Sequence, residues 1–138
     1  MSTMLTSGFE EIRHTADWAL RVWAADLPTL FAQAARGMYT LEGVETAPTP
    51  QLERRINLSG EDAESLLVAF LNELLYLQET EHLAFDTLQC IIHDHHLEVK
   101  ALGRPIRHLN KAIKAVTFHN LAIRSTPQGL ETTLTFDV

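Results

Sequence analysis

Two segments of the chain carry hydrophobic residues at alternating spacings of three and four, the period of an amphipathic α-helix. In the first segment these residues are Leu27, Leu30, Phe31, Ala34, Ala35, Met38 and Leu41. In the second they are Leu66, Leu67, Phe70, Leu71, Leu74 and Leu77. Asp26 stands where a helix N-cap belongs, and the acidic residues in 59–64 suit the positive end of a helix dipole. The pattern predicts two helices, each with one buried face.

Other segments alternate between apolar and polar residues with a period of two, which indicates β-strands. These segments are residues 9–14, 18–23, 52–58, 83–92, 97–102, 116–124 and 130–138. Residues 93–96 and 125–129 are expected to form turns, and 42–50 and 103–114 to form polar connections. The order β-β-α-β-α-β-β-β-β predicts an α+β fold in which two helices pack on one face of a mixed β-sheet.

The composition is typical of a globular domain. The 138 residues are 46% hydrophobic, which suits one domain, residues 1–138, with a real core. No apolar stretch reaches the length of a membrane span, and the N-terminus lacks a signal-peptide pattern, so we expect a cytoplasmic protein. Cys90 is the lone cysteine, which excludes multi-cysteine zinc sites. Its apolar neighbours predict a buried, inert thiol.

Charge is distributed unevenly along the chain. The net charge of −7 argues against simple, sequence-independent binding of nucleic acid. Residues 99–130 nevertheless contain no Asp or Glu, and we call this segment the acid-free window. Its cations are Lys100, Arg104, Arg107, Lys111, Lys114 and Arg124. The window is either an ordinary solvated surface or a basic patch for a polyanion or an acidic partner.

Two polar clusters lie near predicted turns. His93-Asp94-His95-His96 has metal-binding side chains, but at a hairpin turn these diverge into solvent, which disfavours a specific metal site. His14 and Asp17 stand three residues apart in a short connection. Asp17 could orient His14 as a base or bind a metal, or the segment could be a turn stabilised by Asp and Thr side chains. The residues by themselves leave these alternatives open.

Three further charged residues are candidates at element boundaries. Asp137 stands beside the terminal carboxylate of Val138, an oxygen-rich setting that suits Mg²⁺, Ca²⁺ or Mn²⁺, or else a solvated tail. Lys114 stands at the entry to an apolar strand, where it could meet a carboxylate or protect a sheet edge. Glu73 lies at the border of the second helix's apolar face, and is either solvated or directed into a pocket.

Four short motifs, taken in order, resemble the archease family. They are His14-Thr15-Ala16-Asp17 followed by Leu20-Arg21-Val22, the helical run 66–76, the run 114–119, and the closing Phe136-Asp137-Val138. Each motif is short, but their collinear order over residues 9–138 is specific.

The resemblance implies a protein cofactor and not an autonomous enzyme. Archeases assist RtcB-type RNA ligases in tRNA splicing and RNA repair, by promoting guanylylation of the ligase and restoring multiple turnover. The family's functional residues carry over onto Asp17, Lys114 and Asp137, with His14 and Glu73 as second-rank members. A divalent metal (Ca²⁺, Mg²⁺ or Mn²⁺) is implied at Asp17, Asp137 and Val138, and RNA is expected to be contacted only through the ligase.

The sequence departs from the family pattern at several positions. Arg13 stands where the family usually has an Asp, and an arginine beside Asp17 would compete with a cation. Arg104 follows Gly103 where a Glu is common, and Phe118 replaces a more usual Tyr. Two rival functions remain open. One is a small hydrolase that uses His14 and Asp17 as an acid–base pair, and the other is a chaperone-like binding module that uses the acid-free window.

Overall fold

The structure is a computed structural model that describes residues 6–13, 18–118 and 120–138. Its helices are α1 (Leu27–Glu42) and α2 (Ala63–Glu81). Its strands are β1 (Gly8–Ile12), β2 (Trp18–Ala24), β3 (Glu45–Thr46), β4 (Leu52–Ser59), β5 (Leu83–His93), β6 (His96–His108), β7 (Ala115–Thr117), β8 (Arg124–Thr126) and β9 (Gly129–Asp137). The predicted α+β class is confirmed, and the element order broadly follows the prediction.

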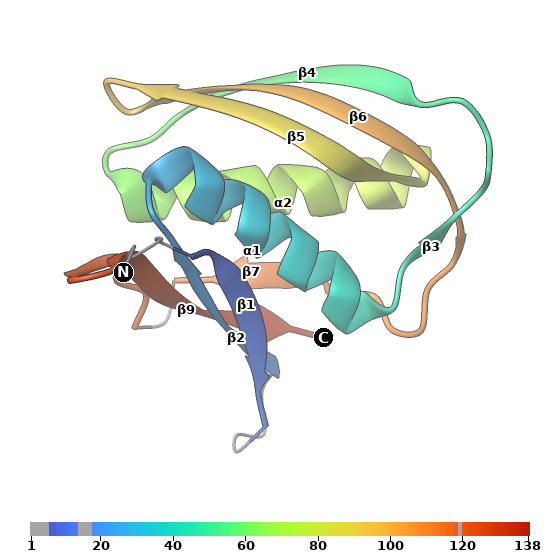
Figure 1. Ribbon diagram of the computed structural model, residues 1–138. Helices are drawn as coiled ribbons and strands as arrows, with labels where there is room; N and C mark the ends of the chain where they lie inside the picture. Colours follow the sequence, from blue (N-terminus) through green and yellow to red (C-terminus); the bar gives the residue numbers. More distant parts are fainter. Residues whose placement is uncertain (1–5, 14–17, 119) are drawn as a thin grey trace, which may run out of the picture.

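The two helices lie between two antiparallel sheets (Figure 1). The first sheet has the order β1-β2-β9-β7, with β8 also paired to β9. The second has the order β3-β6-β4, with β5 also paired to β6. Every described strand pair is antiparallel, so the sheets are not mixed as the sequence pattern had suggested.

The helices contact both sheets because α2 is apolar on more than one side. Its buried residues include Leu66, Leu67, Val68, Phe70, Leu71, Leu74 and Leu75. A helix that is apolar around most of its circumference must be covered from several directions. The rings of Phe31 in α1 and Phe70 in α2 stack with centroids 5.7 Å apart in this central layer. Neither described helix is both long and apolar enough to cross a membrane.

The helix starts follow the local sequence. The side chain of Asp26 accepts the backbone N–H of Thr29 at 2.9 Å, which confirms it as the N-cap of α1. Asp62 accepts the backbone N–H of Ser65 at 2.7 Å and caps α2 in the same way. Each bond satisfies a donor that has no partner within its helix.

The predicted strand over residues 116–124 is wrong in detail. Two short strands, β7 and β8, pair with opposite ends of β9, and the described residues between them are outside any strand. The predicted connections also contain strand residues, because β3 pairs with the end of β6 and β6 extends to His108. These pairings join segments far apart in sequence, so local alternation could not reveal them.

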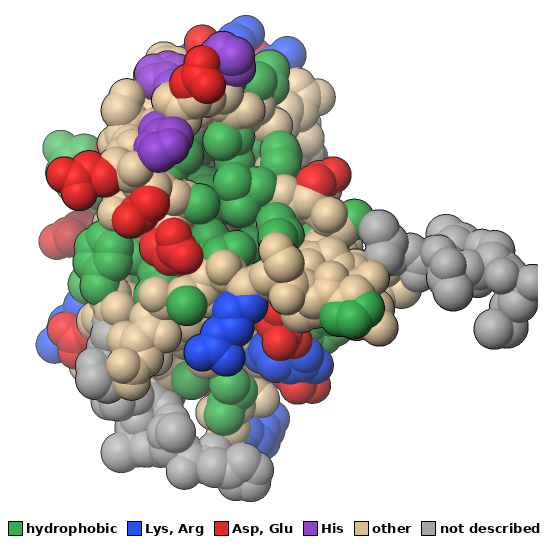
Figure 2. All heavy atoms as spheres, turned by 90° about the vertical axis from the view of Figure 1, so that its left-hand side faces the viewer, with side chains coloured by type: hydrophobic (Ala, Val, Ile, Leu, Met, Phe, Trp, Pro, Cys, Tyr) green, Lys and Arg blue, Asp and Glu red, His purple; other side chains and the backbone are tan. Residues whose placement is uncertain are grey.

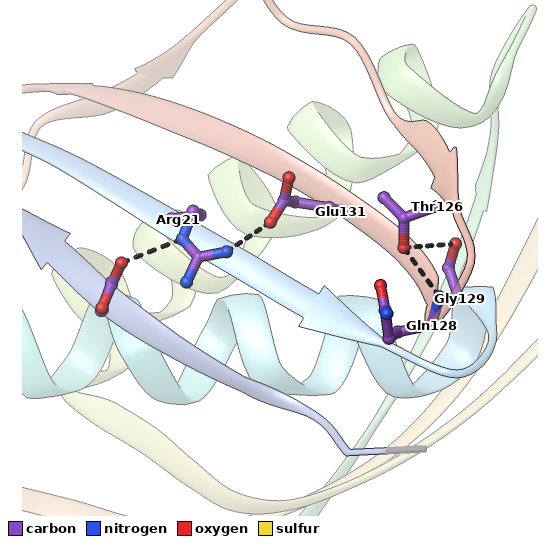
Figure 3. Close-up of polar contacts among 6 residues, drawn as sticks. Arg21, Thr126, Gln128, Gly129 and Glu131 are labelled. Carbon is purple, nitrogen blue, oxygen red and sulfur yellow. Dashed lines mark hydrogen bonds and ion pairs between the residues drawn. The ribbon is translucent and has the colours of Figure 1, made fainter. Parts of the chain in front are cut away.

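Both predicted turns are confirmed. At the turn between β5 and β6, Asp94 and His95 have positive φ angles of 46° and 62°. At the turn between β8 and β9, Gly129 has a φ of 133°, and Thr126 accepts the N–H of Gln128 at 3.2 Å (Figure 3). On the adjoining strands, Arg21 joins Glu10 and Glu131 across the first sheet (Figure 3).

Candidate functional site

Lys114 and Asp137 lie side by side where β7 begins and β9 ends. The backbone N–H of Lys114 donates to the backbone C=O of Asp137 at 2.7 Å, and Ala115 continues the pairing. Both side chains are exposed. Antiparallel pairing thus brings together two candidate residues that are 23 positions apart in the chain.

The first described residue of β2 reaches the same end of the sheet. Trp18 is paired with Phe136, the residue before Asp137, because β9 lies between β2 and β7. His14 and Asp17 precede Trp18 in the sequence but lie outside the described residues, so their predicted roles stay predictions.

Arg13 is described and carries an ion pair of its own. Its Nη2 lies 3.7 Å from Oε1 of Glu11, and the Arg13 side chain is 81% exposed. An exposed pair of this kind contributes at most about 1 kcal/mol to stability. The competition expected between Arg13 and a cation at Asp17 stays a prediction.

Asn72 in α2 holds the outer edge of β7. Its Oδ1 accepts the backbone N–H of Val116 at 2.9 Å, and its Nδ2 donates to the Val116 C=O at 3.4 Å. The amide therefore replaces the neighbouring strand that an edge strand lacks. Sequence reasoning missed this role, since an Asn within an apolar helix face was the only signal. The neighbouring Glu73 is half-buried and has no hydrogen bond or ion pair with any described residue.

Glu42, the last residue of α1, holds the connection between β6 and β7, residues 109–114. Its side chain is fully buried, and its Oε2 accepts the backbone N–H of Ile113 at 2.9 Å. Gln78 of α2 donates to the same oxygen at 2.7 Å. Burial raises the pKa of Glu42, and the two hydrogen bonds offset part of that rise. Sequence reasoning missed this residue because it assigned Glu42 to a polar loop.

A groove of about 560 Å³ runs between α2 and this connection. Tyr76, Gln78, Glu79 and His82 line it from α2 or its C-cap, and Lys114 lies on the opposite side. Tyr76 is 59% exposed, which is unusual for an aromatic side chain. The groove places polar and aromatic groups beside Lys114 at the surface.

The acid-free window is not a continuous basic surface. Lys100 lies 3.8 Å from Glu53, Arg107 lies 3.8 Å from Glu45, and Arg104 pairs with Asp86. These acids come from other strands or their neighbours, which the sequence window could not include. Within the part of the chain that is described, the remaining cations have no ion-pair partner; they are Lys111, Lys114 and Arg124.

The other polar candidates lie at the surface or carry no reactive group. Figure 2 shows histidine and acidic side chains gathered at the end of the molecule that carries the β5–β6 turn. There His93 and Asp94 are 84% and 89% exposed, as expected for a turn. Burial raises the pKa of Cys90 to about 11, so its thiol stays protonated at neutral pH.

The described residues supply part of a donor set for a divalent cation. Asp137 offers carboxylate oxygens, which are the ligands that Mg²⁺ and Ca²⁺ prefer. Over residues 6–13, 18–118 and 120–138, no group of three or more His, Cys, Asp or Glu side chains could hold a metal ion. Further donors for a metal at this end of the sheet would have to come from outside that set, and Asp17, which precedes Trp18, is the predicted one.

Comparisons with known protein sequences give a consistent result. A family model described as "Archease protein family (MTH1598/TM1083)" matches residues 9–138. Protein archease of Thermococcus kodakarensis is 32% identical over 88% of this chain and 91% of its own length. Protein archease of Pyrococcus furiosus is 33% identical over the same shares. The family match thus includes every described element, apart from Gly8 at the start of β1.

Solved structures show the same architecture. The solution structure of protein 1598 of Methanobacterium thermoautotrophicum is similar with a TM-score of 0.73 and 29% sequence identity. It covers 95% of this chain and 99% of its own. A crystal structure from Thermotoga maritima, titled as an archease and possible chaperone, has a TM-score of 0.70 at 24% identity. It covers 94% of this chain and 96% of its own, and supports the fold alone.

Proposed function

This chain belongs to the archease family, and we propose that it acts as a protein cofactor that activates an RtcB-type RNA ligase. In this role it promotes guanylylation of the ligase and restores its multiple turnover in tRNA splicing or RNA repair. The protein contacts RNA only through the ligase. The chemistry belongs to the ligase, and this chain supplies charged groups at its active site.

The observation that carries the proposal is the pairing of Lys114 with Asp137 at the end of the first sheet, where β7 begins and β9 ends. Their backbones are hydrogen-bonded to each other, while both side chains face solvent. Lys114 has no ion-pair partner among the described residues. A charged group on a fixed backbone can enter a partner's active site without first breaking an internal contact.

The proposed work of these residues is electrostatic. The Lys114 ammonium would donate hydrogen bonds to phosphate oxygens of the nucleotide that reacts on the ligase. Asp17, Asp137 and Val138 would hold a divalent cation, Ca²⁺, Mg²⁺ or Mn²⁺, which would neutralise phosphate charge when bound. His14 and Glu73 are proposed as supporting residues of the same site, and the stimulation assay described next tests them as well.

The test measures the rate at which a purified RtcB-type ligase is labelled by GTP with and without this protein. Lys114→Ala, Asp137→Ala and Asp17→Ala are each expected to reduce the stimulation by at least about tenfold, since losing one transition-state donor typically costs about 100-fold. Lys111→Ala is the matched control, because Lys111 is an exposed lysine of the same connection and also lacks a described ion-pair partner. Circular dichroism checks that each variant folds.

The outcomes separate the proposal from its rivals. Full stimulation by all three alanine variants would overturn it. Hydrolytic turnover by this protein without a ligase would favour the acid–base pair of His14 and Asp17. Stimulation that is lost in Lys111→Ala as well would favour a binding role for the cations of the acid-free window. Removal of divalent ions with a chelator, followed by their return, tests the cation part separately.

A further inference from the structure

The connection that ends at Lys114 is anchored to the interior by one residue. The Oε2 of Glu42 accepts the N–H of Ile113 at 2.9 Å. The backbone C=O of Glu42 accepts the N–H groups of Asn110 at 2.8 Å and Lys111 at 3.3 Å. Glu42 therefore holds three backbone amides of this connection, two through its backbone C=O and one through its side chain.

The burial of the Glu42 carboxylate costs free energy of folding. A fully buried carboxylate loses its hydration, and Glu42 also lies at the C-terminal end of α1, where the helix dipole disfavours negative charge. One of its oxygens, Oε1, and Oε1 of Gln78 have no hydrogen-bond donor among the described residues. α2 ends at His82 in the left-handed conformation with no buried acid at its last turn, so ending a helix does not require one.

Two more contacts fix the backbone immediately after the anchor. The N–H of Lys114 donates to the C=O of Asp137 at 2.7 Å. Val116 is bonded through both its N–H and its C=O to the side chain of Asn72. The backbone around Lys114 is thus held by α1, by β9 and by α2, while the Lys114 side chain remains exposed.

We propose that Glu42 and Asn72 are positioning residues for Lys114, which fix its backbone on either side so that the ammonium is presented from one defined point. The inference rests on the proposed function of Lys114. The physical reason is that a lysine side chain is long and flexible, so its placement depends on where its Cα is held. A displacement of about 1 Å in a group that supports a reaction can cost about 100-fold in rate.

If Glu42 only stabilised the fold, its loss would act like the loss of a comparable side-chain bond elsewhere near β7. One control variant separates this role from a positioning role. The carboxylate of Glu64 in α2 accepts the N–H of Ile123 at 3.0 Å, in the connection that follows β7. Glu64→Ala therefore removes the same kind of bond from the other side of β7. Glu42→Gln keeps an oxygen for the Ile113 N–H, and its new amide N–H₂ can serve the unpaired acceptor of Gln78.

The experiment titrates each variant against an RtcB-type ligase and GTP, at a temperature where every variant is folded. It records the maximal stimulated rate and the concentration for half-maximal stimulation. Glu42→Ala and Asn72→Ala should lower the maximal rate by about 10-fold to 100-fold. Glu42→Gln and Glu64→Ala should stimulate like the wild type. Glu42→Asp, whose shorter side chain withdraws the acceptor, carries the test if Glu42→Ala does not fold.

Amide hydrogen exchange supplies a readout that needs no ligase. Glu42→Ala should speed exchange at Ile113 and Lys114 by about tenfold or more, and Glu64→Ala should leave both unchanged. Equal loss of stimulation in Glu42→Ala and Glu64→Ala, or unchanged exchange at Ile113 and Lys114 in Glu42→Ala, would overturn the inference. If the wild type itself fails to stimulate any RtcB-type ligase, the proposed function is wrong, and exchange alone then decides whether Glu42 holds this backbone.

Discussion

Glu42 and Asp137 are two acidic residues that each accept a backbone N–H at or next to Lys114, and their side chains lie in opposite environments. Glu42 is fully buried, accepts two hydrogen bonds at one oxygen and has a raised pKa. Asp137 is exposed and joins the network through its backbone C=O, which leaves its side chain available to a partner. The same chemical group serves as an internal anchor in one place and as a surface group in the other, because burial and backbone contacts decide its role.

The largest expected difference between the two carboxylates is in stability. Glu42→Ala should lower the free energy of unfolding by about 2–4 kcal/mol, because it leaves the Ile113 N–H and the Gln78 amide buried without an acceptor. Asp137→Ala should change it by less than about 0.5 kcal/mol, as for an ordinary surface substitution. Urea denaturation measures both. Equal losses in the two variants would contradict the distinction between anchor and surface group.

The second expected effect, smaller than the loss of stability, is a pH dependence of stability that comes from Glu42. Burial raises the pKa of Glu42 in the folded state above its value in the unfolded chain, so the folded state binds the proton more tightly. The contribution of Glu42 is therefore fully present below the ordinary pKa of a glutamate, and is lost as the pH rises through the raised pKa. Burial and, to a lesser extent, the Glu42 charge raise the pKa of Tyr39, so its hydroxyl stays protonated at neutral pH.

Glu42→Gln removes this titration, and it offers a direct measurement. The stability of Glu42→Gln relative to the wild type should rise as the pH is increased above the ordinary pKa of a glutamate, about 4.3, because only the wild type then loses the contribution of the protonated carboxyl. A constant difference between Glu42→Gln and the wild type as the pH is increased would show that Glu42 has the same pKa in both states.

The smallest effect is expected for the paired cations of the acid-free window. Arg107→Ala removes an ion pair at 3.8 Å between side chains that are 64% and 59% exposed. Solvent screens such a pair, so the free energy of unfolding should fall by less than about 0.5 kcal/mol. Thermal or urea unfolding at low and high salt checks this. A loss above about 1 kcal/mol would mean that the pairing of this window supports the fold.

Part of the fold could be predicted from local pattern. The two helices, the N-cap Asp26 and the turns at 93–96 and 125–129 follow from spacing and turn chemistry, which act over a few residues. The split of residues 116–124 into β7 and β8 could not be predicted, because it depends on which parts of β9 are free to pair. The placement of both helices between two sheets likewise depended on how the layers meet.

The candidate site, like the fold, could be predicted from the sequence only in part. Lys114 and Asp137 were selected by their match to a family motif, and the structure shows that their backbones are joined. Glu42 and Asn72 were missed, because their partners lie 71 and 44 positions away in the sequence. No local pattern distinguishes an acid that caps a distant connection from an acid in a loop.

The amino-acid sequence by itself determined the helical faces, the strand periodicity, the turn positions and the motifs that place this chain among the archeases. The faces, the periodicity and the turns depend on neighbours within about one helical turn or two strand positions, and the motifs can be read from their order along the chain. The tertiary structure alone decided that acids from other segments neutralise part of the acid-free window, and that Glu42 and Asn72 hold the backbone around Lys114. Charges and buried hydrogen bonds act through space, and their partners are set only when the layers have packed.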